Sequence, residues 1–276
     1  MTARNYLASI ALAAIVLTGI VNAQTTASAP EADLEYQISG ILYTQKSAEY
    51  RALAYQAFNL ARVQLDADFD KKTLKKLPKE QRKLPRAIVV DIDETVLDNS
   101  MANAAGAKTN TPFNTKDWYA YGELRKSKAV PGAVDFLNYA VSKGVTIFYI
   151  SNRDEVQKQA TIDNLKSVGL KDVVGDNVML RQNGQSPKGP RRDVVTAKHR
   201  IILLVGDNLD DFSEIFERKS IAERYTGVEQ NREQWGKRFI VLPNAMYGTW
   251  ENAIYEYQRL TEAQKAEKRA AALELP

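Results

Sequence analysis

The feature that most constrains this chain is a short apolar run that ends in two aspartates. Residues 87–90 (Ala-Ile-Val-Val) are typical of a buried strand, and Asp91 and Asp93 follow directly. In parallel α/β sheets, ligands bind at the carboxyl ends of strands. Two carboxylates this close repel each other unless a cation or a shared proton compensates, and Mg²⁺ prefers such oxygen ligands. The stretch indicates a cation site that also takes a phosphate; the alternative is a polar turn in which Asp93 acts as a cap.

Composition excludes several kinds of site. The chain has 276 residues, 44% of them hydrophobic, which suffices for one large domain or for a core with a smaller accessory domain. It has no cysteine, so disulfides, thiolate catalysis and thiolate metal sites are excluded. The single histidine, His199, cannot build a histidine-rich metal site. The net charge is +4, and the lysines and arginines are mixed with acidic residues along the chain. This pattern favours small anionic substrates and does not indicate nucleic-acid binding.

Residues 1–23 have the pattern of a secretory signal peptide. Arg4 gives a positive start, residues 6–21 are mostly apolar, and residues 21–23 resemble a cleavage site that leaves Gln24 first. The alternative is a membrane anchor, but the apolar stretch is short for a spanning helix. We expect a periplasmic or secreted product without a stable membrane anchor.

Strands and helices alternate along the remaining chain. Helical spacing of apolar residues predicts helix over 31–84, with the lysine-rich part, 71–83, as an exposed turn. Further strands are predicted at 145–150, 177–180, 201–205 and 239–242, and further helices at 131–143, 154–168, through His199, and at 251–271. Such alternation predicts a parallel α/β sheet covered by helices on both faces.

The polar residues after these strands suit phosphate-ester hydrolysis. Asp91 is the candidate nucleophile, which would form an aspartyl phosphate, and Asp93 is the candidate acid and base. Asp207 follows another strand and would be a further oxygen ligand of Mg²⁺. Ser151 is suited to binding a phosphate oxygen, and Lys188 to neutralising charge on the phosphoryl group.

Each supporting residue also has a structural interpretation. Asp211 would fix the Lys188 ammonium, or it would cap a helix. Ser151 and Asn152 would cap the helix that follows them. Lys188 would be one of many loop lysines.

At these residues the chain resembles the haloacid dehalogenase superfamily. The match comprises Asp-x-Asp-x-Thr at 91–95, Ser151, Lys188 and Gly-Asp-x-x-x-Asp at 206–211. More narrowly, the chain is similar to the class C bacterial acid phosphatases, the family of the lipoprotein e (P4) 5′-nucleotidase. That similarity rests on the runs 91–100, 129–133, 149–153, 205–212 and 242–250, which span the mature chain in order.

The resemblance implies a Mg²⁺-dependent phosphomonoesterase with a Rossmann-like core and a smaller, mainly helical accessory domain. The core would be 85–276, with an insert at about 99–128, and 24–84 would contribute to the accessory domain. Asp91 would be nucleophile and metal ligand, and Asp207 the other carboxylate ligand. Asp93 would be acid and base, and would bind the metal through its backbone carbonyl. Asn152 and Asp211 would support these catalytic residues.

The resemblance also implies nucleotide substrates, whose base would lie between Trp118 and Tyr247. Ordinary packing is the alternative for both side chains, and exposed aromatics are equally compatible with a homodimer. Two features depart from the family. The lipobox cysteine is missing, and Lys188 lies in a Gly- and Pro-rich segment, 183–192.

Two other functions fit the same residues. One is a phosphotransferase that passes the phosphoryl group from Asp91 to an acceptor alcohol. The other is a binding or storage protein without turnover, although Asp91 and Asp93 are both intact.

Overall fold

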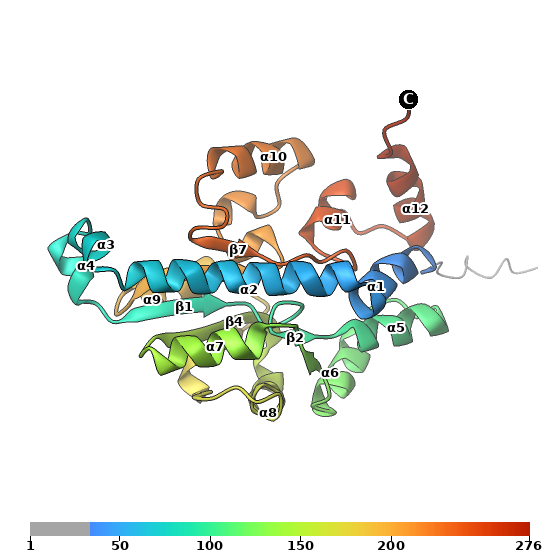
Figure 1. Cartoon of the computed structure of the whole chain (residues 1–276). Helices are drawn as coiled ribbons and strands as arrows, with labels where there is room; N and C mark the ends of the chain where they lie inside the picture. Colours follow the sequence, from blue (N-terminus) through green and yellow to red (C-terminus); the bar gives the residue numbers. More distant parts are fainter. Residues whose placement is uncertain (1–33) are drawn as a thin grey trace, which may run out of the picture. The chain divides into compact units, whose positions relative to one another are not determined.

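A five-stranded parallel sheet forms the centre of the fold (Figure 1). The computed structural model describes residues 34–276, so the predicted signal peptide lies outside the described residues. The strand order is β5 (Val178–Arg181), β4 (Thr146–Asp154), β1 (Arg86–Val90), β6 (Arg200–Gly206) and β7 (Phe239–Val241). Every neighbouring pair is parallel, as the alternation of strands and helices predicts.

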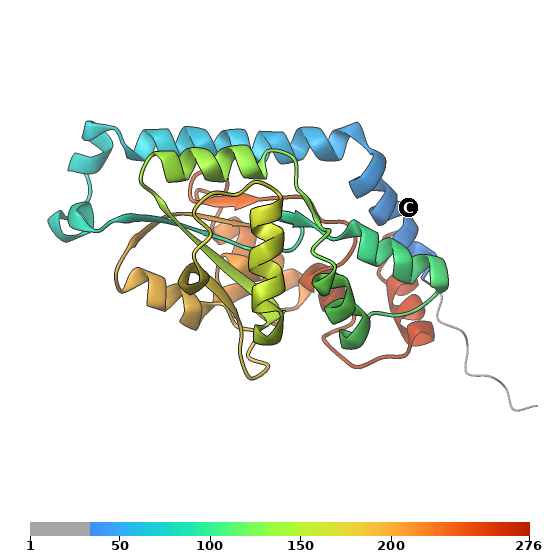
Figure 2. The same ribbon diagram turned by 90° about the horizontal axis from the view of Figure 1, so that it is seen from below.

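Helices cover both faces of the sheet (Figure 2). On one face lie α2 (Ala48–Asp68) and α7 (Ala133–Ser142), and α9 (Gly189–Thr196) lies on the other. The strand residues alternate between two buried clusters, as the period of a strand requires. In β1, Ile88 and Val90 face the α2 and α7 side, whereas Ala87 and Val89 face the α9 side.

The long helix α2 is anchored by one apolar stripe. Ala54, Phe58, Ala61 and Leu65 recur every three or four residues, and all are almost completely buried. Burying Phe58 and Leu65 contributes about 1.5–3 kcal/mol each. The Ser47 side chain accepts the Tyr50 N–H at 3.0 Å and so fixes the start of the helix.

From residue 34 on, the predicted helix over 31–84 is four helices: α1 (Tyr36–Lys46), α2, α3 (Lys71–Lys75) and α4 (Lys79–Lys83). Residues 31–33 lie outside the described residues. The prediction of a turn at 71–83 is wrong, because two short helices form there. The Asp70 side chain caps α3 by accepting the N–H groups of Lys72 and Thr73.

A short antiparallel pair, β2 (Leu97–Asp98) and β3 (Lys128–Ala129), flanks the segment predicted as an insert. Between the two strands lie α5 (Ser100–Thr109) and α6 (Thr115–Glu123), neither of which we predicted individually. Asn114 caps α6 by accepting the Asp117 N–H at 2.9 Å. The division of the chain into domains stays a prediction.

Three helix predictions need correction. The helix at 154–168 begins as a 3₁₀ turn and becomes α8 (Lys158–Ser167), and α9 ends before His199. The C-terminal helix predicted at 251–271 is two helices, α11 (Thr249–Ile254) and α12 (Glu262–Ala271). Glu256 and Tyr257 adopt positive φ angles of 52° and 58°, which ends a right-handed helix.

One helix, α10 (Ile221–Gln230), was not predicted at all. Its signal was available, because Ser220 and Glu223 form a reciprocal capping box. Among residues 34–276, none of the helices combines the length and apolar character needed to cross a bilayer.

Candidate active site

Two neighbouring strands deliver aspartates to one edge of the sheet. Asp91 follows the end of β1, and Asp207 follows the end of β6. Because these strands are parallel, both side chains emerge at the carboxyl edge. The Asp91 N–H also donates to the carbonyl of Val205 at 2.9 Å, which ties the loop after β1 to β6.

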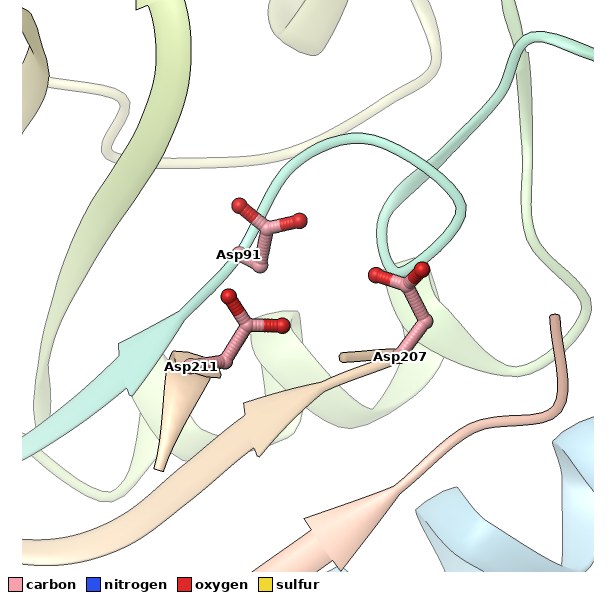
Figure 3. A group of neighbouring side chains, drawn as sticks. All are labelled: Asp91, Asp207 and Asp211. Carbon is pink, nitrogen blue, oxygen red and sulfur yellow. The ribbon is translucent and has the colours of Figure 1, made fainter. Parts of the chain in front are cut away.

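Three carboxylates gather at this edge (Figure 3). One oxygen from each of Asp91, Asp207 and Asp211 lies within 4.8 Å of the others. Asp211 reaches the group from the 3₁₀ turn after β6. Gly206 permits this approach, because a Cβ there would lie only 2.3 Å from Asp211 Oδ2. Oxygen atoms grouped in this way suit a hard divalent cation.

Lys188 lies among these acids. Its ammonium contacts the Asp91 carboxylate and donates to Asp211 Oδ1 at 2.6 Å, and all three side chains are buried. Burial alone would lower the pKa of Lys188, but the charges of Asp211 and Asp91 raise that pKa above its ordinary value. Lys188 is therefore a permanent cation at the site and not a free loop lysine. Its contact with Asp211 is the one the sequence suggested.

Asp91 is held in an environment that disfavours its charge. Burial raises its pKa well above the ordinary value, and Lys188 opposes this effect. The negative charges of Asp211, Asp207 and Asp93 raise it further. The negative charges of this cluster are therefore not balanced by Lys188 alone. A bound cation would favour the ionised form of Asp91.

Asp207 is oriented by two neutral donors. Thr95 Oγ1 donates to Asp207 Oδ1 at 3.1 Å, and Asn244 Nδ2 donates to Oδ2 at 2.8 Å. Burial and then the charge of Asp211 raise the pKa of Asp207 to about 7, although both hydrogen bonds act to lower it. The side chain is therefore fixed in direction but not neutralised.

The Asp93 carboxylate contacts a different set of residues. Arg153 donates from Nε to Asp93 Oδ1 at 2.9 Å, and Asn99 Nδ2 donates to the same oxygen at 2.8 Å. Ser151 Oγ donates to Asp93 Oδ2 at 3.1 Å. Burial acts to lower the pKa of Arg153, but the charge of Asp93 raises it overall. Asp93 thus has a cation of its own, separate from Lys188.

Ser151 and Asn152 lie within β4 and do not cap the helix that follows. Arg191 holds both: NH1 donates to the Ser151 carbonyl and NH2 to Asn152 Oδ1, each at 2.6 Å. Burial lowers the pKa of Arg191. Arg191 therefore fixes the end of β4 next to the carboxylates.

The two predicted base-binding aromatics are both connected to the loop that carries Asp93. Trp118, half-buried in α6, has the Arg153 guanidinium 5.2 Å from its ring centre and stacks on Tyr121 at 6.0 Å between ring centres. The Tyr247 hydroxyl donates to the buried carboxylate of Glu94. Trp118 is therefore linked to Asp93 through Arg153, and Tyr247 contacts Glu94 directly. Asp93 and Glu94 belong to the same loop.

Six residues of the site were not predicted to have a role in it: Glu94, Thr95, Asn99, Arg153, Arg191 and Asn244. Glu94 adopts a positive φ of 55° and accepts the Asn99 N–H at 2.9 Å, so it shapes the loop after β1. A basic residue directly after Ser-Asn at a strand end was the available signal for Arg153. Nothing in the local sequence distinguishes Arg191 from its neighbour Arg192.

Comparison with known proteins agrees with this geometry. Residues 3–250 match the model of HAD superfamily subfamily IIIB, the acid phosphatases. The chain belongs to this family. It is similar to the class C acid phosphatase from Bacillus anthracis with tungstate bound, at 38% identity and a TM-score of 0.81 over 88% of this chain and 98% of that one. A second structure of that enzyme matches at 37% identity, with the same TM-score and coverage.

As a subfamily IIIB acid phosphatase, the chain is a phosphomonoester hydrolase that acts on small-molecule phosphate esters. Membership disfavours the alternative of a binding or storage protein. HAD acid phosphatases use a divalent metal, and the buried cluster of Asp91, Asp207 and Asp211 offers suitable oxygen ligands. The residues present therefore fit such an ion.

Proposed function

We propose that this acid phosphatase is exported, uses Mg²⁺, and hydrolyses phosphate monoesters, including nucleoside 5′-monophosphates, through a phosphorylated Asp91. One observation carries the proposal: buried Asp91 lies beside Lys188 within a three-carboxylate cluster, whereas Asp93 is held separately by Arg153. Two neighbouring carboxylates with different cations can take different chemical roles.

The proposed Mg²⁺ ligands are the carboxylates of Asp91 and Asp207 and the backbone carbonyl of Asp93, with Asp211 available to the ion or to Lys188. When bound, the ion supplies charge compensation for the acids and polarises the phosphoryl group. A bound cation would therefore favour the charged form of Asp91, which burial disfavours.

In the first half-reaction, an Asp91 oxygen attacks phosphorus as the bond from phosphorus to the leaving oxygen breaks. Asp93, protonated when the ester binds, gives that proton to the leaving oxygen. Lys188 binds a non-bridging phosphoryl oxygen, and the Ser151 hydroxyl binds another after it turns away from Asp93 Oδ2, to which it donates in the free enzyme. Arg153 and Asn99 keep the Asp93 carboxyl aimed at the leaving group through their hydrogen bonds.

In the second half-reaction, Asp93 takes a proton from water as the water oxygen attacks phosphorus. The bond between phosphorus and Asp91 breaks, which releases inorganic phosphate and restores the Asp91 carboxylate. Borohydride added during turnover tests this intermediate, because it reduces a phosphorylated Asp91 to homoserine. Mass spectrometry that finds homoserine at position 91 supports the proposal, and an unmodified Asp91 during steady turnover contradicts it.

Nucleotide specificity is proposed to come from Trp118 and Tyr247. Stacking on an aromatic ring is worth about 1–3 kcal/mol per base and tolerates any base. Trp118→Ala should therefore lower kcat/KM for AMP at least fivefold more than for phenyl phosphate, by about 1 kcal/mol or more. Tyr225→Ala removes an exposed aromatic on α10 and is the matched control. Equal losses on both substrates would argue against base stacking.

Export has its own test. The full chain is produced in a Gram-negative host, and the N-terminus of the protein in the periplasmic fraction is sequenced. A product that begins at Gln24 supports the predicted cleavage after residue 23. Intact chain held in the membrane fraction would favour the anchor instead.

A further inference from the structure

A cavity lies at the opposite, amino edge of the same sheet. Its volume is about 460 Å³, and its walls come from the end of α2, the α3–α4 segment and the chain entering β6 and β7. Figure 1 shows α3 and α4 at the end of β1 that lies away from β2. β6 starts at this cavity with Arg200 and ends before Asp207, so about 20 Å separates the cavity from the acid cluster.

The one acidic side chain among the residues lining this cavity is already neutralised. Asp68 accepts from Arg200 NH1 and NH2, both at 2.6 Å, and from Arg86 Nε at 2.6 Å. Burial acts to raise the pKa of Asp68, but the two arginines outweigh it and lower that pKa. A carboxylate shared by two guanidinium groups leaves an excess of positive charge.

Among the other cationic groups of the lining, Lys237 forms an ion pair with Glu233 at 2.7 Å. Arg238 is exposed to solvent, and among residues 34–276 its side chain has no ion-pair or hydrogen-bond partner. Arg200 Nε and His199 Nδ1 are shielded from solvent and also lack a hydrogen-bond partner. Buried polar atoms are normally satisfied, so unpaired ones beside a cavity point to a ligand.

The remaining wall is partly apolar and partly formed by neutral polar side chains such as Gln64, Thr73 and Gln81. Leu77, Leu84, Ile201 and Ile202 line the cavity beside these polar groups. The volume lies in the range of small-molecule sites, which typically combine an apolar lining with a few placed polar groups. A bare inorganic anion would leave the apolar part of this wall unused.

We propose that this cavity is a second binding site, for a small organic anion. The carboxylate or phosphate head of the ligand contacts Arg238 and His199, and its apolar body contacts Leu77, Ile201 and Ile202. The site lies outside the catalytic machinery, and the proposal does not depend on the substrate of the acid edge.

The experiment is an NMR titration of the ¹⁵N-labelled full chain with benzoate, phenylphosphonate and inorganic phosphate in turn. None of these probes is hydrolysed. We expect saturable shifts at the amides of Thr196, His199 and Ile201 with the two aromatic probes; the tighter of the two identifies the preferred head group. Arg238→Gln should weaken this binding about tenfold, the usual effect of losing one charge-assisted hydrogen bond.

Arg232→Gln is the matched control, because Arg232 is an exposed arginine of the same segment that does not line the cavity. It should leave the affinity unchanged. Phenylphosphonate shifts at the Gly206–Asp211 amides report the acid edge and should be the same in both variants, which also shows that both are folded. The proposal is overturned by an absence of saturable shifts at the cavity, by equal weakening in both variants, or by inorganic phosphate binding as tightly as the aromatic probes.

Discussion

The two edges of the central sheet both bury carboxylates, but they balance charge in opposite ways. At the amino edge, one carboxylate, Asp68, is shared by Arg86 and Arg200. At the carboxyl edge, the acids outnumber the cations: Asp91, Asp207 and Asp211 gather around Lys188 alone. The first arrangement lowers a pKa and the second raises one.

This difference distinguishes a carboxylate with a structural role from carboxylates with a functional role. A carboxylate that is fully paired stabilises the fold and has no capacity left for a ligand. A cluster with excess negative charge is unfavourable until a cation binds, and perturbed carboxyl groups of this kind are common at active sites. The same sheet therefore has a stabilising edge and a reactive edge.

The largest effect should come from the reactive edge. Asp91→Asn removes the proposed nucleophile and should lower kcat by about 10⁴-fold or more, as removal of a nucleophile does in other enzymes. The fold should remain intact, because the amide has the same size. Turnover of p-nitrophenyl phosphate measures the loss, with Asp135→Asn, an exposed aspartate of α7, as the control. A rate close to that of the wild type would end the assignment of Asp91.

At the stabilising edge, Asp68→Asn should reduce stability with little change in kcat. It breaks a partly buried pair with two arginines, so the free energy of unfolding should fall by about 3 kcal/mol at pH 7. The folded pKa of Asp68 is depressed, so its contribution is present above the unfolded pKa and is lost as pH falls through the folded value. The difference between variant and wild type should therefore shrink below about pH 4.

Urea unfolding at several pH values measures this difference. Glu80→Gln, an exposed acid of α4, is the control and should be close to neutral at every pH. A pH-independent loss in Asp68→Asn would show that its charge is not what stabilises this edge.

Removal of divalent metal should affect only the reactive edge. Chelation should abolish activity, and Mg²⁺ at a hundred times its Kd should restore about 2.7 kcal/mol of stability. In the metal-free protein, the pKa of Asp207 is raised to about 7, so stability falls as pH rises from about 4 toward 7. The Tm gain from Mg²⁺ should therefore widen from pH 5 to pH 8 in differential scanning calorimetry. A gain that narrows with rising pH would contradict the charge imbalance.

The smallest effect should have the opposite sign to that of Asp68→Asn. Burial, with the charges of Asp93 and Asp207, raises the pKa of Glu94. Glu94→Gln removes this charge while keeping an acceptor for the Asn99 N–H, so the metal-free protein should gain about 1 kcal/mol at pH 8. At pH 5 the gain should be smaller, because a carboxyl group with a raised pKa carries less negative charge at the lower pH. Chemical unfolding at both pH values tests this, and destabilisation at pH 8 would refute it.

The sheet could be predicted from the sequence because buried parallel strands are continuous apolar runs. All five predicted strands are present, each to within a few residues. The breaks between helices were harder to predict. The turn at Glu256 and Tyr257 carries no glycine or proline, so nothing local predicts that the C-terminal helix ends there.

The site was predictable where motif residues follow strands, and not where tertiary contacts decide. Asp91 and Asp207 come together because adjacent parallel strands end at one edge. The ion pair of Arg153 with Asp93 joins residues 60 positions apart. Only the pairing of β1 with β4 shows that this arginine is buried and not exposed at a strand end.

The helix α2 contributes residues near both the amino edge and the carboxyl edge of the sheet. α2 has 21 residues and is therefore about 31 Å long. Near its start, burial raises the pKa of Tyr50, and the charges of Asp98, Glu94 and Asp207 raise it further. The last residue of the helix is Asp68. Inserting a single residue midway would rotate everything beyond it by about 100°. Asp68 would turn away from both arginines while Tyr50 stayed in place, so evolution can vary the composition of α2 far more freely than its length.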